Sequence, residues 1–350
     1  MSDSRESDRY DRVLNRAGEF LRTRQNPNGS TKSAGSIWGY YSQPLALLSG
    51  GSACDWSCAN RCLDYIQREF VDDRGALRIE PFEYVGDLYP YPYLIRGACT
   101  WGRVDVSIPL TRFLLGFQDA CGGFAYRLND SRLIDPAVTA HGGICLLLTG
   151  HVAEAEKAGR FLVRLHDSQP DPEHRYLTVW DTQTNNLLTD YRTVDDVPWG
   201  DGSQLVRENP HGGNAYWDIG YMLAFLSSLF QTTGDRDYLR VAEEMSEIVG
   251  RYKGYEKHVW KTPWGCAALY QATGNRRYLE TALTMAEEIV KCQQDDGGFF
   301  LGEQSCYVDN SNQQWSYAFK DYEELQANSD ILIDTTAQMM HYLGQVCAVL

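Results

Sequence analysis

Two segments of the chain carry the same turn sequence and decide the fold: Gln118-Asp-Ala-Cys-Gly-Gly-Phe124 and Gln293-Gln-Asp-Asp-Gly-Gly-Phe299. Related turn signals lie at Gln25 to Gly29, at Asp72 to Gly75, around Gln169 and near Gly254. Most of these turns are 43 to 47 residues apart, and one interval of 85 residues contains an insertion. A fixed period of this length indicates a repeated helical unit.

Two kinds of helix alternate between the turns. The segments before turns, such as 242–249 and 286–290, have apolar residues at helical spacing with charges opposite, as expected of surface helices with one buried face. The other segments are apolar nearly all round, which is typical of buried helices; they cover roughly 36–49, 91–100, 136–149, 212–232, 263–273 and 330–347. Six outer and six inner helices predict an all-α fold, an (α/α)6 toroid of about six helical hairpins that forms one domain over 1–350.

One interval holds a segment of different character, at 174–208. Tyr176 to Trp180, a polar turn, and Leu187 to Tyr191 form the pattern of a small β-hairpin, and an acidic loop follows. We expect this insertion to be a lid over one mouth of the toroid.

Charge and composition exclude several kinds of partner. The chain of 350 residues has a net charge of −15 and no cluster of Lys and Arg, which argues against nucleic acid. It has no apolar run long enough for membrane insertion or a signal peptide, so we expect a cytoplasmic protein. Ten cysteines fall mostly within apolar helical patterns and are expected to be reduced thiols. Homo-oligomerisation is left open.

The turns at Gln118 and Gln293 resemble the QW repeat, Q-x3-G-x-W, of the squalene-hopene cyclase and protein prenyltransferase superfamily, with Phe in place of Trp. This terpenoid cyclase-like resemblance covers most of the chain and implies a closed ring of hairpins. The same architecture serves linalool dehydratase-isomerases, N-acylglucosamine 2-epimerases and unsaturated glucuronyl hydrolases, so it implies a fold more than a reaction.

The catalytic motifs of that superfamily are missing from the sequence. The nearest stretch to the D-x-D-D proton donor, Thr193-Val-Asp-Asp196, lacks the first Asp, and neither a DDxxD motif nor the prenyltransferase zinc pattern is present. We therefore expect a protein that uses no metal and no cofactor.

Candidate catalytic residues gather where the inner helices begin, the usual place of the pocket in this fold. His141 and His211 are each followed by two glycines, and Asp218 and Asp334 lie in otherwise apolar helix starts. A histidine titrates near neutral pH, and burial raises the pKa of a carboxyl group, so both types of residue suit acid/base chemistry. The alternative for each is a helix cap or a satisfied core hydrogen bond.

Aromatic and polar residues at the same helix starts are the expected substrate-binding group. The chain has 22 Tyr, 12 Phe and 9 Trp, and many fall in short loops, where aromatic rings usually line a ligand site. The predicted members are Trp38, Tyr40, Tyr89, Tyr91, Asn214, Tyr216, Trp217, His258, Trp264 and Cys266. Lys261 lies in the same group without an assigned role.

These features predict an enzyme, an isomerase, cyclase or lyase, that acts on a small molecule. The first hypothesis is a cofactor-independent acid/base isomerase, cyclase or dehydratase of natural product biosynthesis, acting on a terpenoid or other apolar intermediate between aromatic rings. The second is a carbohydrate epimerase, lyase or unsaturated-uronide hydrolase with the same histidines and aspartates. The third is a toroid that binds a ligand without catalysis.

Overall fold

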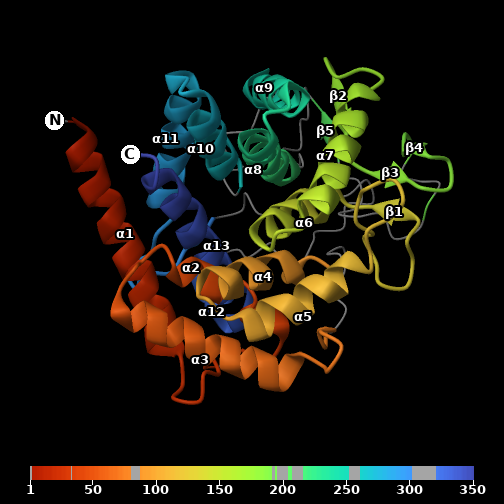
Figure 1. Cartoon of the computed structure of the whole chain (residues 1–350). Coiled ribbons are helices and arrows are strands. Elements are labelled where there is room, and N and C mark those ends of the chain that lie inside the picture. The colour runs from red at the N-terminus through yellow and green to blue at the C-terminus, as the bar shows by residue number, and fades with distance from the viewer. Residues whose placement is uncertain are drawn as a thin grey trace.

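The computed structural model describes residues 2–32, 34–79, 87–190, 194, 204–206, 216–251, 261–301 and 321–350. Helices dominate this part of the chain (Figure 1). They are α1 (Ser2–Arg24), the short 3-10 helix η1 (Ile37–Gly39), α2 (Gln43–Leu47), α3 (Ala53–Phe70), α4 (Pro90–Thr100), α5 (Val104–Leu115), α6 (Pro136–Leu148), α7 (Val152–Asp167), α8 (Tyr216–Thr233), α9 (Arg236–Arg251), α10 (Thr262–Thr273), α11 (Arg276–Lys291), α12 (Tyr322–Ala327) and α13 (Ser329–Cys347). None of the described helices is both long and apolar enough to cross a lipid bilayer.

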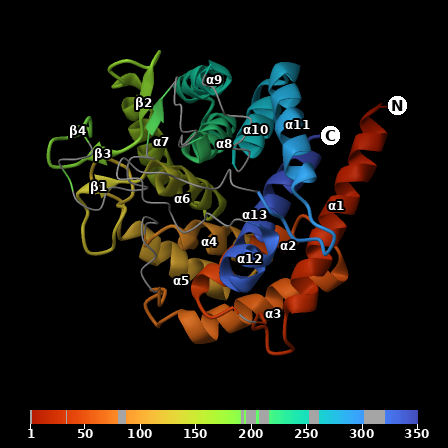
Figure 2. The same ribbon diagram turned by 180° about the vertical axis from the view of Figure 1, so that it is seen from behind.

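The helices form two concentric rings. The inner helices α2, α4, α6, α8, α10 and α13 each contact the next one, and α13 contacts α2, which closes the ring. The outer helices α1, α3, α5, α7, α9 and α11 pack against them from outside (Figures 1 and 2). Their buried faces carry apolar side chains such as Leu165, Met245 and Ile289. The predicted (α/α)6 toroid is confirmed, and each predicted inner segment overlaps an observed inner helix.

The two faces of the ring differ in their connections. Each inner helix except α13, the last, is joined to the following outer helix by a tight turn, as at Gly234 and Gly274, which have φ of 75° and 70°. Long segments lead from each outer helix back to the next inner helix. All the inner helices therefore begin on the same face, which is the face of the long connections.

The glycine turns that suggested the repeat hold neighbouring outer helices together. Gly29, Gly75, Gly122 and Gly297 all have positive φ, between 83° and 100°. A Cβ at any of them would lie 2.4 Å or less from a backbone oxygen of another outer helix; these oxygens belong to Arg61, Pro109, Lys157 and Arg16 respectively. Only glycine permits both this conformation and this close approach.

The glutamines of these turns reach the same neighbours. Nε2 of Gln25 donates to the backbone oxygen of Cys58 at 2.8 Å, Gln118 donates to Glu154 at 2.9 Å, and Gln293 donates to Val13 at 2.9 Å. The glutamine side chain thus links the end of one outer helix to another, which helps to close the ring of hairpins that the QW resemblance implied.

The backbone amide that follows each turn donates to a hydroxyl group of an inner helix or its N-terminal flank. Thr31 N donates to Tyr40 Oη at 3.1 Å, and Leu77 N donates to Tyr91 Oη at 2.7 Å. The equivalent amides of the other two turns donate to threonines, Phe124 N to Thr139 Oγ1 at 2.9 Å and Phe299 N to Thr336 Oγ1 at 3.2 Å. Tyrosine and threonine therefore have the same role in different repeats.

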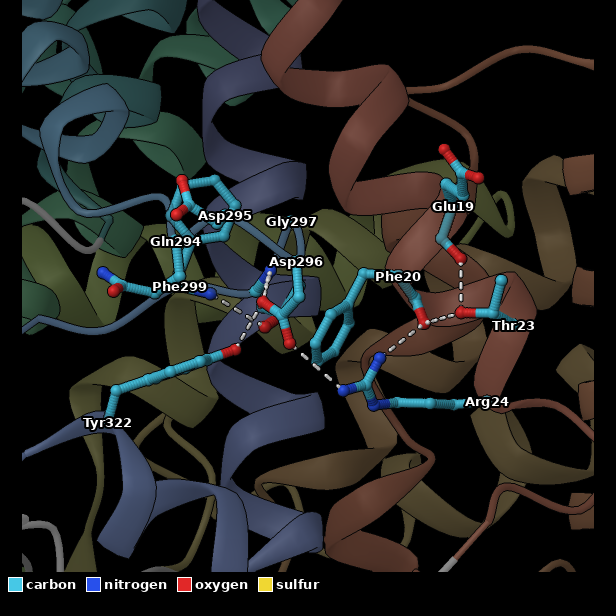
Figure 3. Close-up of polar contacts among 12 residues, drawn as sticks. Glu19, Phe20, Thr23, Arg24, Gln294, Asp295, Asp296, Gly297, Phe299 and Tyr322 are labelled. Atoms are coloured by element: carbon cyan, nitrogen blue, oxygen red, sulfur yellow. Dashed lines mark hydrogen bonds and ion pairs between the residues drawn. The ribbon is translucent and has the colours of Figure 1, made fainter.

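The last of these turns closes the ring against the first helix (Figure 3). Asp296 forms an ion pair with Arg24 of α1 at 3.3 Å and accepts a hydrogen bond from the Tyr322 hydroxyl at 2.7 Å. Arg16 of α1 donates to the backbone oxygens of Gln294 and Asp295, at 2.8 and 2.9 Å. Residues nearly 280 positions apart in the sequence thus join the two ends of the helical array.

The insertion contains short antiparallel strands (Figure 1). They are β2 (Arg175–Leu177), β3 (Trp180–Asp181), β4 (Asn186–Leu187) and β5 (Gln204–Val206), while β1 (Leu133–Ile134) precedes α6. The sheet order is β1-β3-β4, with Trp180 opposite Leu187, and β2 pairs separately with β5. The predicted hairpin is therefore present between β3 and β4. The expected strand 176–180 is divided in two because its halves pair with different partners.

Candidate functional site

The inner helices direct one stripe of polar side chains toward the axis of the ring. On α4 and its N-cap the stripe is Tyr89, Tyr93 and Arg96, and on α13 it includes Asp334 and Gln338. Residues spaced by three, four or seven positions lie on one helix face, one turn below another. Seven helical residues span about 10 Å, so each stripe runs from the mouth into the interior.

Tyrosine hydroxyls meet at the middle of the axis. Tyr93 Oη is 3.3 Å from Tyr89 Oη and 3.1 Å from Gln338 Oε1, to which it donates. It is also 2.5 Å from the hydroxyls of Tyr221 on α8 and Tyr342 on α13. All four tyrosines are buried. This network ties α4, α8 and α13 together across the axis.

Asp334 is a buried carboxylate with several hydrogen-bond donors. Ser42 Oγ donates to its Oδ1 at 2.7 Å, and Gln338 Nε2 donates to its Oδ2 at 2.7 Å. Burial raises the pKa of Asp334 to about 6, while hydrogen bonds from Ser42 and Tyr41 and the charge of Lys261 act against that rise. At neutral pH this group is mainly ionised and can accept a proton.

Asp218 is also a buried carboxyl group, but it lacks the hydrogen-bond donors that surround Asp334. It is 1 % exposed, and within the described residues neither of its oxygens has a donor at ordinary hydrogen-bond geometry; the Thr178 side chain interacts with it only weakly. Burial, and secondly the nearby carboxylate of Asp135, raise the pKa of Asp218 well above its ordinary value, although Thr178 and Lys261 oppose the rise. Burial therefore favours the protonated form of Asp218, which can donate a proton.

Lys261, the N-cap of α10, is close enough to both carboxyl groups for their charges to affect it. Its Nζ is 6.0, 5.6 and 5.8 Å from the ring centres of Tyr89, Tyr221 and Tyr342. Burial lowers its pKa to about 7, and the charges of Asp334 and then Asp218 partly offset this effect. The three residues Lys261, Asp218 and Asp334 are called the charged centre below.

His141 lies deeper, on α6, in a pair with Arg96. Arg96 Nη1 is 2.9 Å from His141 Nε2. Because arginine can only donate, Nε2 must be the acceptor and the ring proton must be on Nδ1. Burial and the Arg96 charge lower the pKa of His141 well below its ordinary value, so the ring is neutral. The Arg96 guanidinium also lies 4.5 Å from the ring centre of Trp264.

The structure brings together five of the predicted site residues. Asp218, Asp334 and Tyr89 surround Lys261, while His141 and Trp264 lie beside each other at 5.8 Å between ring centres. Trp38 is in edge contact with Tyr41, at 5.7 Å, near the same mouth.

Other predicted residues lie elsewhere or outside the description. The hydroxyls of Tyr40 and Tyr91 bind turn amides rather than the charged centre, and Cys266 is buried in α10 with a thiol pKa that burial raises to about 12. His211, Asn214 and His258 lie outside the described residues. Tyr216 and Trp217 begin α8, but their side chains also lie outside the description.

Several central residues were missed from the sequence: Tyr221, Gln338, His341 and Tyr342, together with the central roles of Lys261, Tyr93 and Arg96. Each is three, four, seven or eight positions from another residue of the stripes, for example Tyr221 from Asp218 and Gln338 from Asp334. Extending the predicted stripes by whole helix turns would have found them. Among the described residues, no three His, Cys, Asp or Glu side chains gather in a way that could hold a metal ion.

No known family profile matches the sequence, and no curated protein matches it either. Solved structures do share its fold. An inactive variant of the α-1,6-mannanase GH76A of Salegentibacter sp. HEL1_6, in complex with α-1,6-mannotriose, has a TM-score of 0.65 at 12% identity, over 97% of this chain and 100% of that chain. A D-mannose isomerase has a TM-score of 0.65 at 12% identity, over 97% of both chains.

A terpene cyclase is similar as well. The type II terpene cyclase MstE from Scytonema, as a variant in complex with merosterolic acid A, has a TM-score of 0.59 at 11% identity, over 99% of both chains. At these identities the similarity establishes the (α/α) toroid fold. The terpenoid cyclase-like resemblance is thus one of several within this fold, and the reaction must be argued from the residues.

Proposed function

We propose that this protein is a cofactor-independent enzyme that transfers protons: an isomerase, cyclase or dehydratase of a terpenoid or another apolar natural product. The observation that carries the proposal is the contrast between two buried carboxyl groups near one lysine. Asp334 receives hydrogen bonds of 2.7 Å from Ser42 and Gln338, whereas among the described residues Asp218 has no donor at ordinary hydrogen-bond geometry and only a weak interaction with the Thr178 side chain. Environments that separate the pKa values of two groups in this way assign one as acid and the other as base.

The proposed reaction uses the two carboxyl groups in sequence. Asp218 donates its proton to a double bond or a hydroxyl group of the substrate, and Asp334 removes a proton from another position. Isomerisation and cyclisation then return the substrate's proton count to its starting value, and dehydration releases water. Lys261 titrates near neutral pH and returns the proton from one carboxyl group to the other between turnovers. His141, neutral and paired with Arg96, holds the deeper part of the centre in place.

The aromatic surroundings support an apolar substrate. Trp38, Tyr41 and Tyr89 form consecutive edge contacts, with ring centres 5.7 and 6.0 Å apart, beside Asp334 and Lys261. The negative faces of such rings stabilise positive charge that develops on a protonated hydrocarbon. The deeper hydroxyls of Tyr93, Tyr221 and Tyr342 already bind one another, which leaves less capacity for the hydroxyls of a sugar.

A carbohydrate substrate is the second candidate. It is supported by the pair of carboxyl groups, because paired carboxyl groups also perform glycoside chemistry. Two of the structures with a similar fold are an α-1,6-mannanase and a D-mannose isomerase.

We also propose that the insertion at 174–208 covers the mouth as a lid. Thr178, between β2 and β3, is buried and lowers the pKa of Asp218, so this part of the insertion lies against the charged centre. Tyr176 and Trp180 on either side are buried too and anchor it to the ring.

A ligand-stabilisation screen tests the function. Melting temperatures of the wild type, Asp218→Asn and Asp334→Asn are compared with terpenoid and polyketide alcohols in one set and with sugars and uronates in another. We expect a selective rise with the apolar set, and turnover of the ligands that bind should fall at least about 100-fold in both variants.

Asp55→Asn is the matched control, because Asp55 is equally buried but pairs with Arg22 among the outer helices. It should retain turnover per folded molecule. A rise with sugars alone promotes the second candidate, and full turnover in both variants of the charged centre would refute the mechanism.

A further inference from the structure

Arg96 is a buried cation without a negative partner. It is 7 % exposed, and in the described part of the chain its side chain has one hydrogen bond, to His141, and no carboxylate among the groups that act on it. The face of Trp264 covers it at 4.5 Å. Cation–π contact and one neutral acceptor compensate only part of the cost of removing a guanidinium from water.

None of the titratable groups facing Arg96 supplies the missing charge. These groups are Cys145 on α6, Tyr93 on α4, Tyr221 on α8 and Tyr342 on α13. Burial raises the pKa of each of them, so all four are neutral at pH 7. His141 is a neutral acceptor. Among the described residues, Arg96 therefore has no anionic group in contact with it.

His341 adds an unused polar group at the same place. It is 2 % exposed, and both of its ring nitrogens are buried without a hydrogen-bond partner among the residues that the structure describes. Its ring centre is 5.6 Å from that of Trp264, the side chain that also covers Arg96. Burial and the nearby Arg96 charge lower the pKa of His341, so its ring is neutral and carries one N–H donor.

We propose that Arg96 and His341 together bind one compact monoanion, either a halide ion or a carboxylate group, beside Trp264. The anion would accept hydrogen bonds from the free N–H groups of Arg96 and from the His341 ring, while His141 holds the guanidinium in position. It must be compact because the hydroxyls of Tyr93, Tyr221 and Tyr342 already join one another across the same axis. The site includes none of the proton-transferring residues Asp218, Asp334 and Lys261, so it can be tested apart from the proposed reaction.

The response of thermal stability to anions tests the proposal. Wild-type protein in chloride-free buffer receives sodium chloride, bromide, formate or the bulkier methanesulfonate at constant ionic strength. We expect a saturable rise in melting temperature, about 3 °C at a concentration of 100 times Kd, with the compact anions and not with methanesulfonate. A response to halides identifies a free ion as the occupant, and a response to formate alone identifies the carboxylate of a small molecule.

Variants and crystals locate the binding. Arg96→Met should lose the saturable response and His341→Phe should weaken it at least fivefold. Arg132→Met, which removes an arginine paired with Asp181, should retain it. If Arg96→Met fails to fold, the proposal is tested by His341→Phe and by wild-type crystals soaked in bromide. The proposal requires an anomalous peak beside Arg96 in those crystals. Equal responses to all four salts, a response kept by Arg96→Met, or a peak elsewhere only would overturn the proposal.

Discussion

At the rim of the ring, the turns at Gly29, Gly75, Gly122 and Gly297 repeat one set of contacts, whereas at the axis the inner helices present different polar side chains. Each rim turn places a glycine against another outer helix and donates its next amide to a hydroxyl group. The axis instead combines a lysine, an arginine, two histidines, two aspartates and several tyrosines. The rim turns accordingly have the features of a scaffold, because one packing constraint applies to each of them. The axis has the features of a functional site, because its side chains differ from helix to helix.

The largest effect on stability is expected from a substitution that disrupts one of the rim turns. Gly75 and Gly150 both have φ of 83°, but a Cβ at Gly75 would lie 2.4 Å from Pro109 O, while at Gly150 nothing lies within 4 Å. Gly75→Ala should lower the free energy of unfolding by about 4 kcal/mol, because the turn must leave its neighbour. Gly150→Ala should lower it by only about 1 kcal/mol, the cost of the backbone conformation alone. Urea denaturation of both variants measures the difference, and equal losses would contradict the packing argument.

A smaller effect is expected in the pH dependence of stability, and it tests the buried lysine at the axis. The folded pKa of Lys261 is lowered from 10.5 to about 7, so between these values the unfolded chain binds the extra proton. Burial of Lys261 therefore lowers the free energy of unfolding by its full amount below about pH 7, and this loss of stability disappears as the pH rises through 10.5. Between pH 7.5 and 9.5 the wild type should gain about 2 kcal/mol of stability relative to Lys261→Met. Lys291→Met, at an exposed ion pair of α11, should show no such gain.

The smallest effects are expected from removing the hydroxyl groups of two neighbouring tyrosines, which have different roles. Tyr91→Phe leaves the amide of Leu77 without its acceptor and should cost about 1 kcal/mol of stability without altering ligand binding. Tyr89→Phe removes a hydroxyl from the central network and should change ligand affinity more than stability. Melting temperature and ligand-induced shifts are measured on both. The opposite result would place Tyr91 in the binding site, as its sequence position suggested.

The fold could be predicted because its determinants are local and repeated. Gln118 and Gln293 each precede a glycine by four residues, and the apolar segments between turns match the inner helices closely. The division of 176–180 into β2 and β3 could not be predicted, because it depends on pairing with β5 and β1, which are distant in sequence.

The site could be predicted only in part. Asp218 and Asp334 were identifiable as carboxyl groups in apolar surroundings, but the absence of donors at one and their presence at the other depend on packing across the ring. Tyr40 and Tyr91 resemble Tyr89 in the sequence, yet their hydroxyls point to the turns. Which face of a short helix looks inward is decided by its neighbours, so adjacent tyrosines can have unrelated roles.

The closure of the ring between α13 and α1 has a topological consequence. These helices pack against each other, and the N- and C-terminal ends of the chain lie on one side of the ring (Figures 1 and 2). They meet where every other inner helix passes to an outer helix through a tight turn. A circular permutant with these ends joined by a short linker and the chain reopened at Gly150 should therefore rebuild the same ring, since the order of hairpins around it has no unique beginning.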